Sequence, residues 1–203
     1  MTKSNLAVRA LSPDDWEVVE RLFGGNGACG GCWCMHWRVP RGGKLWEESK
    51  GAKNRRDFRA LVRAGRVHAC VAFDAASGEP VGWCSFGPRR DFPRLATVRA
   101  LRDVSGPDDW AVVCFFVKAA ARGRGVGEAL LREAVRVAGD RGARALEGYP
   151  VTPYGARPVP AAFAWTGVPE LFERAGFEDV TPEGRSRRVY RRKTRPTRRS
   201  RGG

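Results

Sequence analysis

A glycine-rich segment at residues 122–127 (RGRGVG) combines residue types that bind anions. An apolar run typical of a buried strand, Trp110–Val117, precedes it, and apolar residues at helical spacing follow it. A turn that leads from a strand into a helix presents free backbone N–H groups and the positive end of the helix dipole. Glycine permits close approach, and Arg122 and Arg124 add positive charge. The segment therefore predicts a phosphate or pyrophosphate site.

Two nucleotide-binding patterns fit this segment poorly. A Walker loop requires Lys-Ser or Lys-Thr after its glycines, and neither pair is present. The dinucleotide fingerprint requires glycines at positions one, three and six, whereas the glycines here are Gly123, Gly125 and Gly127.

Cys29, Cys32, Cys34 and His36 form a second cluster of chemically capable residues. Zinc prefers four such ligands, but Cys32 and Cys34 would point in opposite directions in an extended segment, so no metal site is expected. Trp33 and Trp37, interleaved with the cysteines, have two open interpretations. They form either the wall of an acceptor pocket or an apolar plug over the core. Trp83 and Ser85 are further candidates for the same pocket.

Hydrophobic periodicity predicts the elements that position these residues. Strands are expected at 5–11, 67–73, 80–86, 110–117, 143–147, 177–180 and 189–190, and helices after Ser12-Pro13, at 54–64, 124–139 and 168–175. Residues 28–48 have no clear assignment, and residues 88–107 are expected to form a loop. The second and third strands should form an antiparallel hairpin.

Composition favours one soluble domain at residues 1–192 with a basic, disordered tail at 193–203. Hydrophobic residues make up 42% of the 203, and the longest apolar run is too short to span a membrane. No secretory signal is recognisable, so six reduced cysteines and a cytoplasmic location are expected. Ten Lys or Arg residues and no acid lie between Arg185 and Gly203, which predicts only nonspecific contacts with nucleic acid.

The chain resembles the GNAT superfamily of acetyl-CoA-dependent N-acetyltransferases. Arg122, Gly125 and Gly127 fill the three fixed positions of that family's pyrophosphate loop, Q/R-x-x-G-x-G/A. Leu171–Phe177 (LFERAGF) is similar to the family's closing LYEKxGF segment. The order of the expected elements also fits, and the resemblance covers roughly residues 5–192.

This resemblance implies an α/β (α+β) fold with a mixed, mostly antiparallel sheet flanked by helices. It also implies acetyl-CoA as co-substrate. The pyrophosphate of acetyl-CoA would be held by Arg122 and the five residues that follow it, Gly123, Arg124, Gly125, Val126 and Gly127. Phe116 and Val117 would pair with the pantetheine arm, and a strand N–H would polarise the thioester carbonyl. The acceptor would be a primary amine on a small molecule or a protein, and homodimers are common in the family.

Two departures from the family pattern leave the proton-transfer groups open. Phe172 stands where the family often has a tyrosine that protonates the CoA thiolate. The central strand also lacks the usual carboxylate, so Glu147 becomes the candidate base, and its alternative is a solvated charge at a strand end. Tyr149, Tyr154 and Thr166 are candidate proton donors. A noncatalytic CoA-binding regulatory module is the alternative function, followed by a zinc- or nucleic-acid-binding protein.

Overall fold

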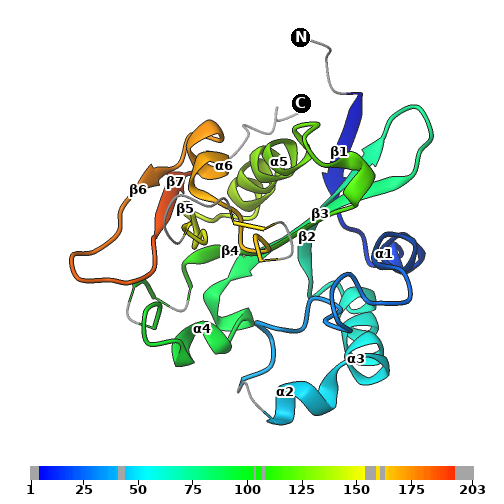
Figure 1. Ribbon diagram of the computed structural model, residues 1–203, viewed down its shortest axis with the longest axis horizontal. Helices are drawn as coiled ribbons and strands as arrows, with labels where there is room; N and C mark the ends of the chain where they lie inside the picture. Colours follow the sequence, from blue (N-terminus) through cyan, green and yellow to red (C-terminus); the bar gives the residue numbers. More distant parts are fainter. Residues whose placement is uncertain are drawn as a thin grey trace, which may run out of the picture.

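A seven-stranded, mixed sheet forms the centre of the molecule (Figure 1). The computed structural model describes residues 5–40, 44–102, 104–106, 108–153, 159–160 and 163–194. Its strands lie in the order β1-β2-β3-β4-β5-β7-β6, and only the β4–β5 pair is parallel. The strands are β1 (Leu6–Ala10), β2 (His68–Asp74), β3 (Pro80–Pro88), β4 (Trp110–Val117), β5 (Ala145–Gly148), β6 (Glu178–Asp179) and β7 (Tyr190–Lys193). The expected mixed, mostly antiparallel sheet is confirmed.

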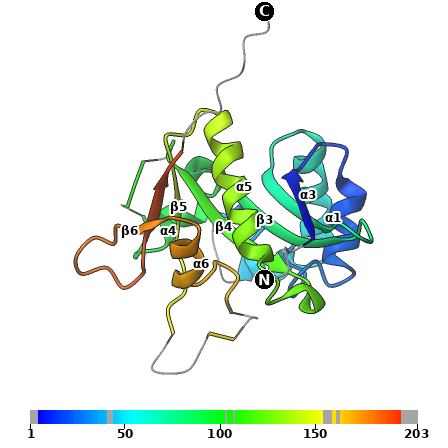
Figure 2. The ribbon, with the colours of Figure 1, turned by 90° about the horizontal axis from the view of Figure 1, so that it is seen from above.

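Helices cover both faces of this sheet. They are α1 (Trp16–Phe23), α2 (Lys44–Ser49), α3 (Ala52–Arg63), α4 (Arg94–Thr97), α5 (Val126–Asp140) and α6 (Pro169–Arg174), with short 3₁₀ turns η1 (Arg89–Asp91) and η2 (Ala119–Ala121). α5 and α6 pack on one face, and α1 and α3 pack on the other (Figures 1 and 2). None of these helices is long and apolar enough to span a membrane within the part of the chain described.

Alternation along the strands separates the two packed layers. In β2, Cys70 and Ala72 face α5, whereas Ala69 and Val71 face α1 and α3. On the α5 face, Gly82 of β3 lets the helix approach closely, because a β-carbon there would overlap the side chain of Val126. The sheet thus fixes the position of the first turn of α5.

The structure corrects several expected boundaries. α1 begins at Trp16 and not directly after Ser12, because the Asp15 carboxylate accepts the Ser12 N–H and closes a turn before the helix. α3 begins at Ala52, two residues before its expected start. The expected loop at 88–107 contains η1 and α4, which are too short to show periodicity in sequence.

The first residue of the expected basic tail belongs to the sheet. Lys193 ends β7, and the Thr194 N–H donates to the Arg144 carbonyl at 3.1 Å. Arg187 and Arg191 are also part of the fold, with hydrogen bonds to Tyr149 and Glu147. The remainder of the expected tail, residues 195–203, lies outside the described residues.

Candidate functional site

The glycine-rich turn lies at the N-terminus of α5 and exposes backbone donors. Gly123 and Gly125 have φ angles of +73° and +77°, in the left-handed region that favours glycine. The first hydrogen bond into the helix runs from the Ala129 N–H to the Gly125 carbonyl, so the N–H groups of residues 126–128 have no acceptor within the helix. A β-carbon on either glycine would meet nothing within 4 Å. The space in front of both glycines is therefore open to a ligand.

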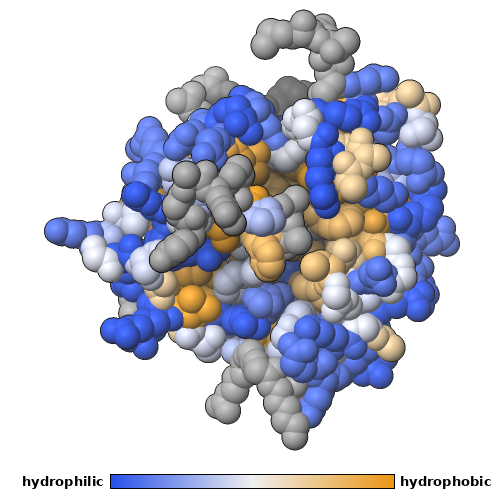
Figure 3. All heavy atoms as spheres, viewed as in Figure 1, coloured by the Kyte–Doolittle hydropathy of each residue, from blue (hydrophilic) through white to orange (hydrophobic). Residues whose placement is uncertain are grey.

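A pocket of about 420 Å³ opens beside this turn. Apolar groups from β4, η2, α5 and α6 line it together with charged groups at its edge; its lining is Val117, Ala121, Arg122, Gly123, Gly125, Val126, Gly127, Glu128, Val168, Leu171 and Arg174. On the face shown in Figure 3, hydrophobic residues gather near the middle and a hydrophilic rim surrounds them. The pocket can accept a ligand with an anionic group and an apolar arm.

The two arginines of the turn have different surroundings. Arg122 lines the pocket, and its Nε donates to the Val117 carbonyl at 3.2 Å. Arg124 is outside the lining and forms an ion pair with Asp74 at 2.8 Å. Sequence reasoning treated them as equivalent because the partner, Asp74, is 50 residues away along the chain.

We expect this difference to appear in ligand binding. Arg122→Gln should weaken binding of the acetyl-CoA that the resemblance implies about tenfold or more, since a hydrogen bond to a charged group contributes about 1.5–3 kcal/mol. Arg124→Gln should weaken it by no more than about fivefold, because Arg124 lies outside the pocket lining and an exposed charge contributes about 1 kcal/mol or less. Isothermal titration calorimetry measures both affinities. Equal losses in the two variants would contradict the assignment of Arg122 to the pocket.

The second half of β4 has a free edge next to this pocket. β4 pairs with β5 only through residues 110–112, so among the described residues no strand pairs with residues 113–117 on that side. We call residues 113–117 the open edge of β4. The Lys118 N–H donates to Val81 of β3, and the Phe115 N–H donates in the other direction, to the Trp165 carbonyl at 2.7 Å. The backbone groups of Phe115 and Val117 therefore face the open edge.

This alternation corrects one residue of the sequence prediction. Phe116 pairs with Trp83 of β3, so its backbone N–H and carbonyl point toward β3 and not toward a pantetheine arm. Its ring packs on the α1 side, 5.8 Å from the ring of Phe23. Phe115 takes its place beside Val117 as a candidate for backbone pairing. The sequence could not show which alternate residues face outward, because β4 is apolar throughout.

An aromatic group packs against β4 from the α1 and α3 face. The indole N–H of Trp37 donates to the Val113 carbonyl at 2.8 Å. His36 lies among three indoles, with its ring centroid 5.2, 5.1 and 4.8 Å from those of Trp37, Trp46 and Trp165. Two of the four residues, Trp37 and Trp165, form hydrogen bonds with the open edge of β4, so the ring group lies next to it. The predicted pocket does not include His36 or Trp46, because the Trp165 ring that packs on His36 lies more than 100 residues further along the chain.

Three other predicted pocket residues lie in the core. Trp33 stacks on Trp16 at 5.7 Å, and Trp83 is fully buried against Phe23 at 5.2 Å. Ser85 is also buried, and its hydroxyl has no hydrogen-bond partner among the described residues. Burial thus favours a core position for Trp33 and Trp83. Trp37 is also buried, and its role as a pocket wall stays a prediction.

The cysteine cluster folds toward β4. Cys34 Sγ lies 3.9 Å from Cys114 Sγ, whereas Cys29 is exposed. Burial raises the pKa of the Cys32 thiol to about 12. Within the described parts of the chain, no three His, Cys, Asp or Glu side chains converge as metal ligands would.

Both histidines of the chain have lowered pKa values. Burial lowers the pKa of His36 to about 4, and the charges of Arg94 and Lys50 contribute. Burial also lowers the pKa of His68 to about 4. Both imidazoles are therefore neutral at pH 7.

We expect these histidines to make stability depend on pH. Because the pKa values of His36 and His68 lie below the value of 6.5 for a free histidine, the unfolded chain binds protons first as pH falls. The free energy of unfolding should decrease between about pH 6.5 and pH 4. Urea denaturation across this range measures it. A His36→Asn/His68→Asn variant should show a flatter profile, and an unchanged slope would contradict the two pKa assignments.

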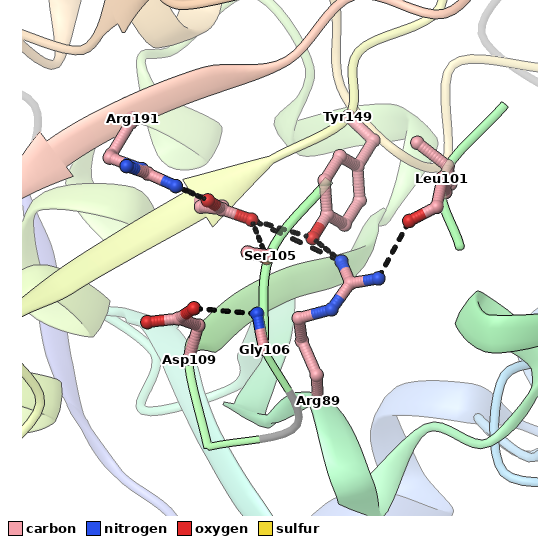
Figure 4. A network of polar contacts seen from close by, with 8 residues as sticks. Arg89, Leu101, Ser105, Gly106, Asp109, Tyr149 and Arg191 are labelled. Atoms are coloured by element: carbon pink, nitrogen blue, oxygen red, sulfur yellow. Dashed lines mark hydrogen bonds and ion pairs between the residues drawn. The ribbon is translucent and has the colours of Figure 1, made fainter. Parts of the chain in front are cut away.

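Glu147 is held in a buried polar network (Figure 4). Its Oε2 accepts the Ser105 hydroxyl at 2.7 Å and the Tyr149 hydroxyl at 3.0 Å, with the Arg89 guanidinium 4.0 Å away. Its Oε1 accepts two hydrogen bonds from Arg191. The structure brings Glu147 and Tyr149 together as neighbours, and neither belongs to the pocket beside the turn.

The candidate proton donors are also enclosed. Tyr149 is fully buried, and burial raises the pKa of its hydroxyl. The Thr166 hydroxyl accepts a hydrogen bond from Arg187 at 2.7 Å. The Phe172 ring fills the core against Gly148 and Gly167, where it has no proton to give. Tyr154 lies outside the described residues.

Comparisons with known proteins agree with this geometry. A profile described as "Acetyltransferase (GNAT) family" matches residues 34–153, which is more than half of the chain. A search of curated protein sequences found no match. Solved structures with a similar fold include mosquito arylalkylamine N-acetyltransferase like 5b, with a TM-score of 0.56 and 16% identity over 93% of this chain and 99% of that one. An N-acetyltransferase from Staphylococcus aureus Mu50 has a TM-score of 0.52 and 15% identity, over 94% of this chain and 99% of that one.

Proposed function

We propose that the protein acetylates a primary amine, which attacks the thioester of acetyl-CoA directly. The chain belongs to the GNAT acetyltransferase family, whose fold implies acetyl transfer from acetyl-CoA. The observation that carries this proposal is the placement of the glycine-rich turn. Left-handed Gly123 and Gly125 direct the donors at the start of α5 into a pocket that continues along Val117 at the open edge of β4.

The residues of this pocket fit acetyl-CoA. The N–H groups of residues 126–128 would hold the pyrophosphate, since no β-carbon occupies the space in front of Gly123 and Gly125. Arg122 would add a charge-assisted contact. Val117, Val168 and Leu171 offer an apolar path for the pantetheine arm. When bound, acetyl-CoA supplies the activated thioester.

Backbone groups of β4 would orient the reacting carbonyl. The N–H groups of Phe115 and Val117 face the open edge, where they would stabilise negative charge that develops on the carbonyl oxygen. The Trp165 carbonyl already accepts the Phe115 N–H. A ligand therefore uses the Val117 N–H or displaces Trp165.

The acceptor amine would approach from the side of Trp37, Trp46 and Trp165. Holding the amine against the thioester would supply much of the rate enhancement through proximity. The sequence suggests Glu147 and Tyr149 for proton transfer, but burial and a full set of hydrogen bonds favour a positioning role for both. Direct proton transfer by either group would require this network to open.

An amine panel read by release of free CoA thiol tests this function. The panel should contain an arylethylamine, a polyamine, an aminoglycoside, free amino acids and a lysine peptide, with the matching alcohols as controls. We expect thiol release that depends on the amine, with the acetylated product identified by mass spectrometry. Binding of acetyl-CoA without turnover of any amine would favour the alternative, a noncatalytic CoA-binding module, for which Phe172 is the supporting observation.

A further inference from the structure

A second pocket, of about 500 Å³, lies at the other end of β3 and shares no residue with the acetyl-CoA pocket. It is formed by the segment after α1, the end of α3, the first residue of β2 and the region around η1. Its lining is Met35, Arg38, Leu61, Gly65, Arg66, His68, Pro88, Arg90, Asp91 and Pro93. Neither the glycine-rich turn nor the open edge of β4 contributes to it.

Arg38 is the unusual group of this second pocket. Its Nε and Nη2 atoms are buried and have no hydrogen-bond partner among the described residues. A buried polar group without a partner is costly, and a buried charge more so. The guanidinium carbon lies over the Phe92 ring, 4.8 Å from its centroid.

The identity of the two free atoms indicates what they bind. Nε and Nη2 lie on one edge of the guanidinium and donate in parallel, which matches the two oxygens of a carboxylate. A single water molecule would satisfy this edge less completely. His68 contributes another buried nitrogen without a partner, Nδ1, to the same lining.

The charged and apolar side chains that line the pocket narrow the class of ligand further. Arg66 adds positive charge at the pocket, Asp91 opposes it, and Arg90 is already paired with Asp108. The pocket therefore favours an anion with one charge over a more highly charged one. Met35, Leu61, Pro88 and Pro93 supply apolar wall around the charged edge.

We propose that this pocket is a second ligand site, which binds an organic monocarboxylate through the Nε and Nη2 edge of Arg38. Its occupant is separate from acetyl-CoA. The proposal does not rest on the acetyl-transfer function, because it involves none of the residues assigned to it.

The chain offers a direct probe, because Met1 and Met35 are its only methionines. With ¹³C-methyl methionine labelling, the Met35 signal reports on the pocket wall, and Met35→Leu assigns it. Benzoate should shift this signal saturably, while benzyl alcohol, its neutral counterpart, should not. Inorganic phosphate should bind more weakly than benzoate. No saturable shift with benzoate at millimolar concentrations, or tighter binding of phosphate, would overturn the proposal.

Variants test the role of the guanidinium edge. Arg38→Gln removes the charge, and Arg38→Lys keeps it without the paired donors. Both should weaken benzoate binding about tenfold or more, since two charge-assisted hydrogen bonds are lost. Arg63→Gln is the matched control, because Arg63 is an exposed residue of α3 outside the pocket, and it should bind benzoate as the unchanged protein does.

Acetyl-CoA binding separates this proposal from a general loss of structure. Affinity for acetyl-CoA should be unchanged in Arg38→Lys, and benzoate should not compete with acetyl-CoA. Benzoate affinity in Arg38→Lys equal to that of the unchanged protein, or competition between the two ligands, would contradict a separate carboxylate site at Arg38.

Discussion

Gly125→Val is expected to reduce acetyl-CoA affinity by at least about 100-fold, or about 2.7 kcal/mol, while the protein stays folded. Gly125 precedes α5 at a φ of +77°, and the space in front of it is open. A valine side chain would stand where the anion contacts the helix N-terminus and would separate it from the backbone donors. Calorimetric titration with acetyl-CoA measures the loss.

Gly142→Val provides the matched control for this experiment. Gly142 follows the other end of α5, with a φ of +88° and nothing within 4 Å of an added β-carbon. Both variants should lose about 1–2 kcal/mol of stability from left-handed strain. Only Gly125→Val should lose affinity. Similar affinity losses in both, or none in either, would place the pyrophosphate elsewhere.

Glu147→Gln is expected to lower the free energy of unfolding by about 3–5 kcal/mol. Glu147 and Arg89 are both buried, and the carboxylate also accepts hydrogen bonds from Arg191, Tyr149 and Ser105. A neutral amide would leave the Arg89 charge without a counter-charge. Its NH₂ group would also face side chains that donate hydrogen bonds to the carboxylate. Urea denaturation measures the effect. The control is Glu128→Gln, expected to cost about 1 kcal/mol or less, because the Glu128 carboxylate is only half-buried in its ion pair with Arg132.

The same variant distinguishes a structural from a catalytic Glu147. If the carboxylate is a general base, the folded variant should lose about 100- to 10,000-fold in kcat with little change in stability. If it positions β5, stability falls and the turnover of the remaining folded enzyme changes little. An Arg89→Met/Glu147→Leu double variant should regain stability, because no buried charge then lacks its partner.

Much of the fold could be predicted from sequence because its signals are local. The apolar run Trp110–Val117 matches β4 residue for residue, and the helical spacing after the glycines matches α5. The segment at 28–40 could not be assigned. Ala28, Trp33 and Cys34 adopt positive φ angles without being glycine, and packing against distant residues such as Trp16 holds them there.

The candidate site was predictable only in part, for the same reason. The glycine-rich turn combines its donors within six residues, so its sequence identifies it. The environment of Glu147 depends on Arg89, Ser105 and Arg191, which lie more than 40 residues away in the chain. A solvated charge at a strand end and a buried carboxylate within a network look identical in sequence.

The absent side chain of Gly82 bears on any attempt to make this protein more heat-resistant. Strand glycines are common targets for such engineering, because glycine weakens a strand. At Gly82, even one methyl group would push Val126 outward and tilt the opening turn of α5 away from the sheet. Replacing this strand glycine would therefore disturb the packing of α5 and, with it, the turn for which ligand binding is proposed.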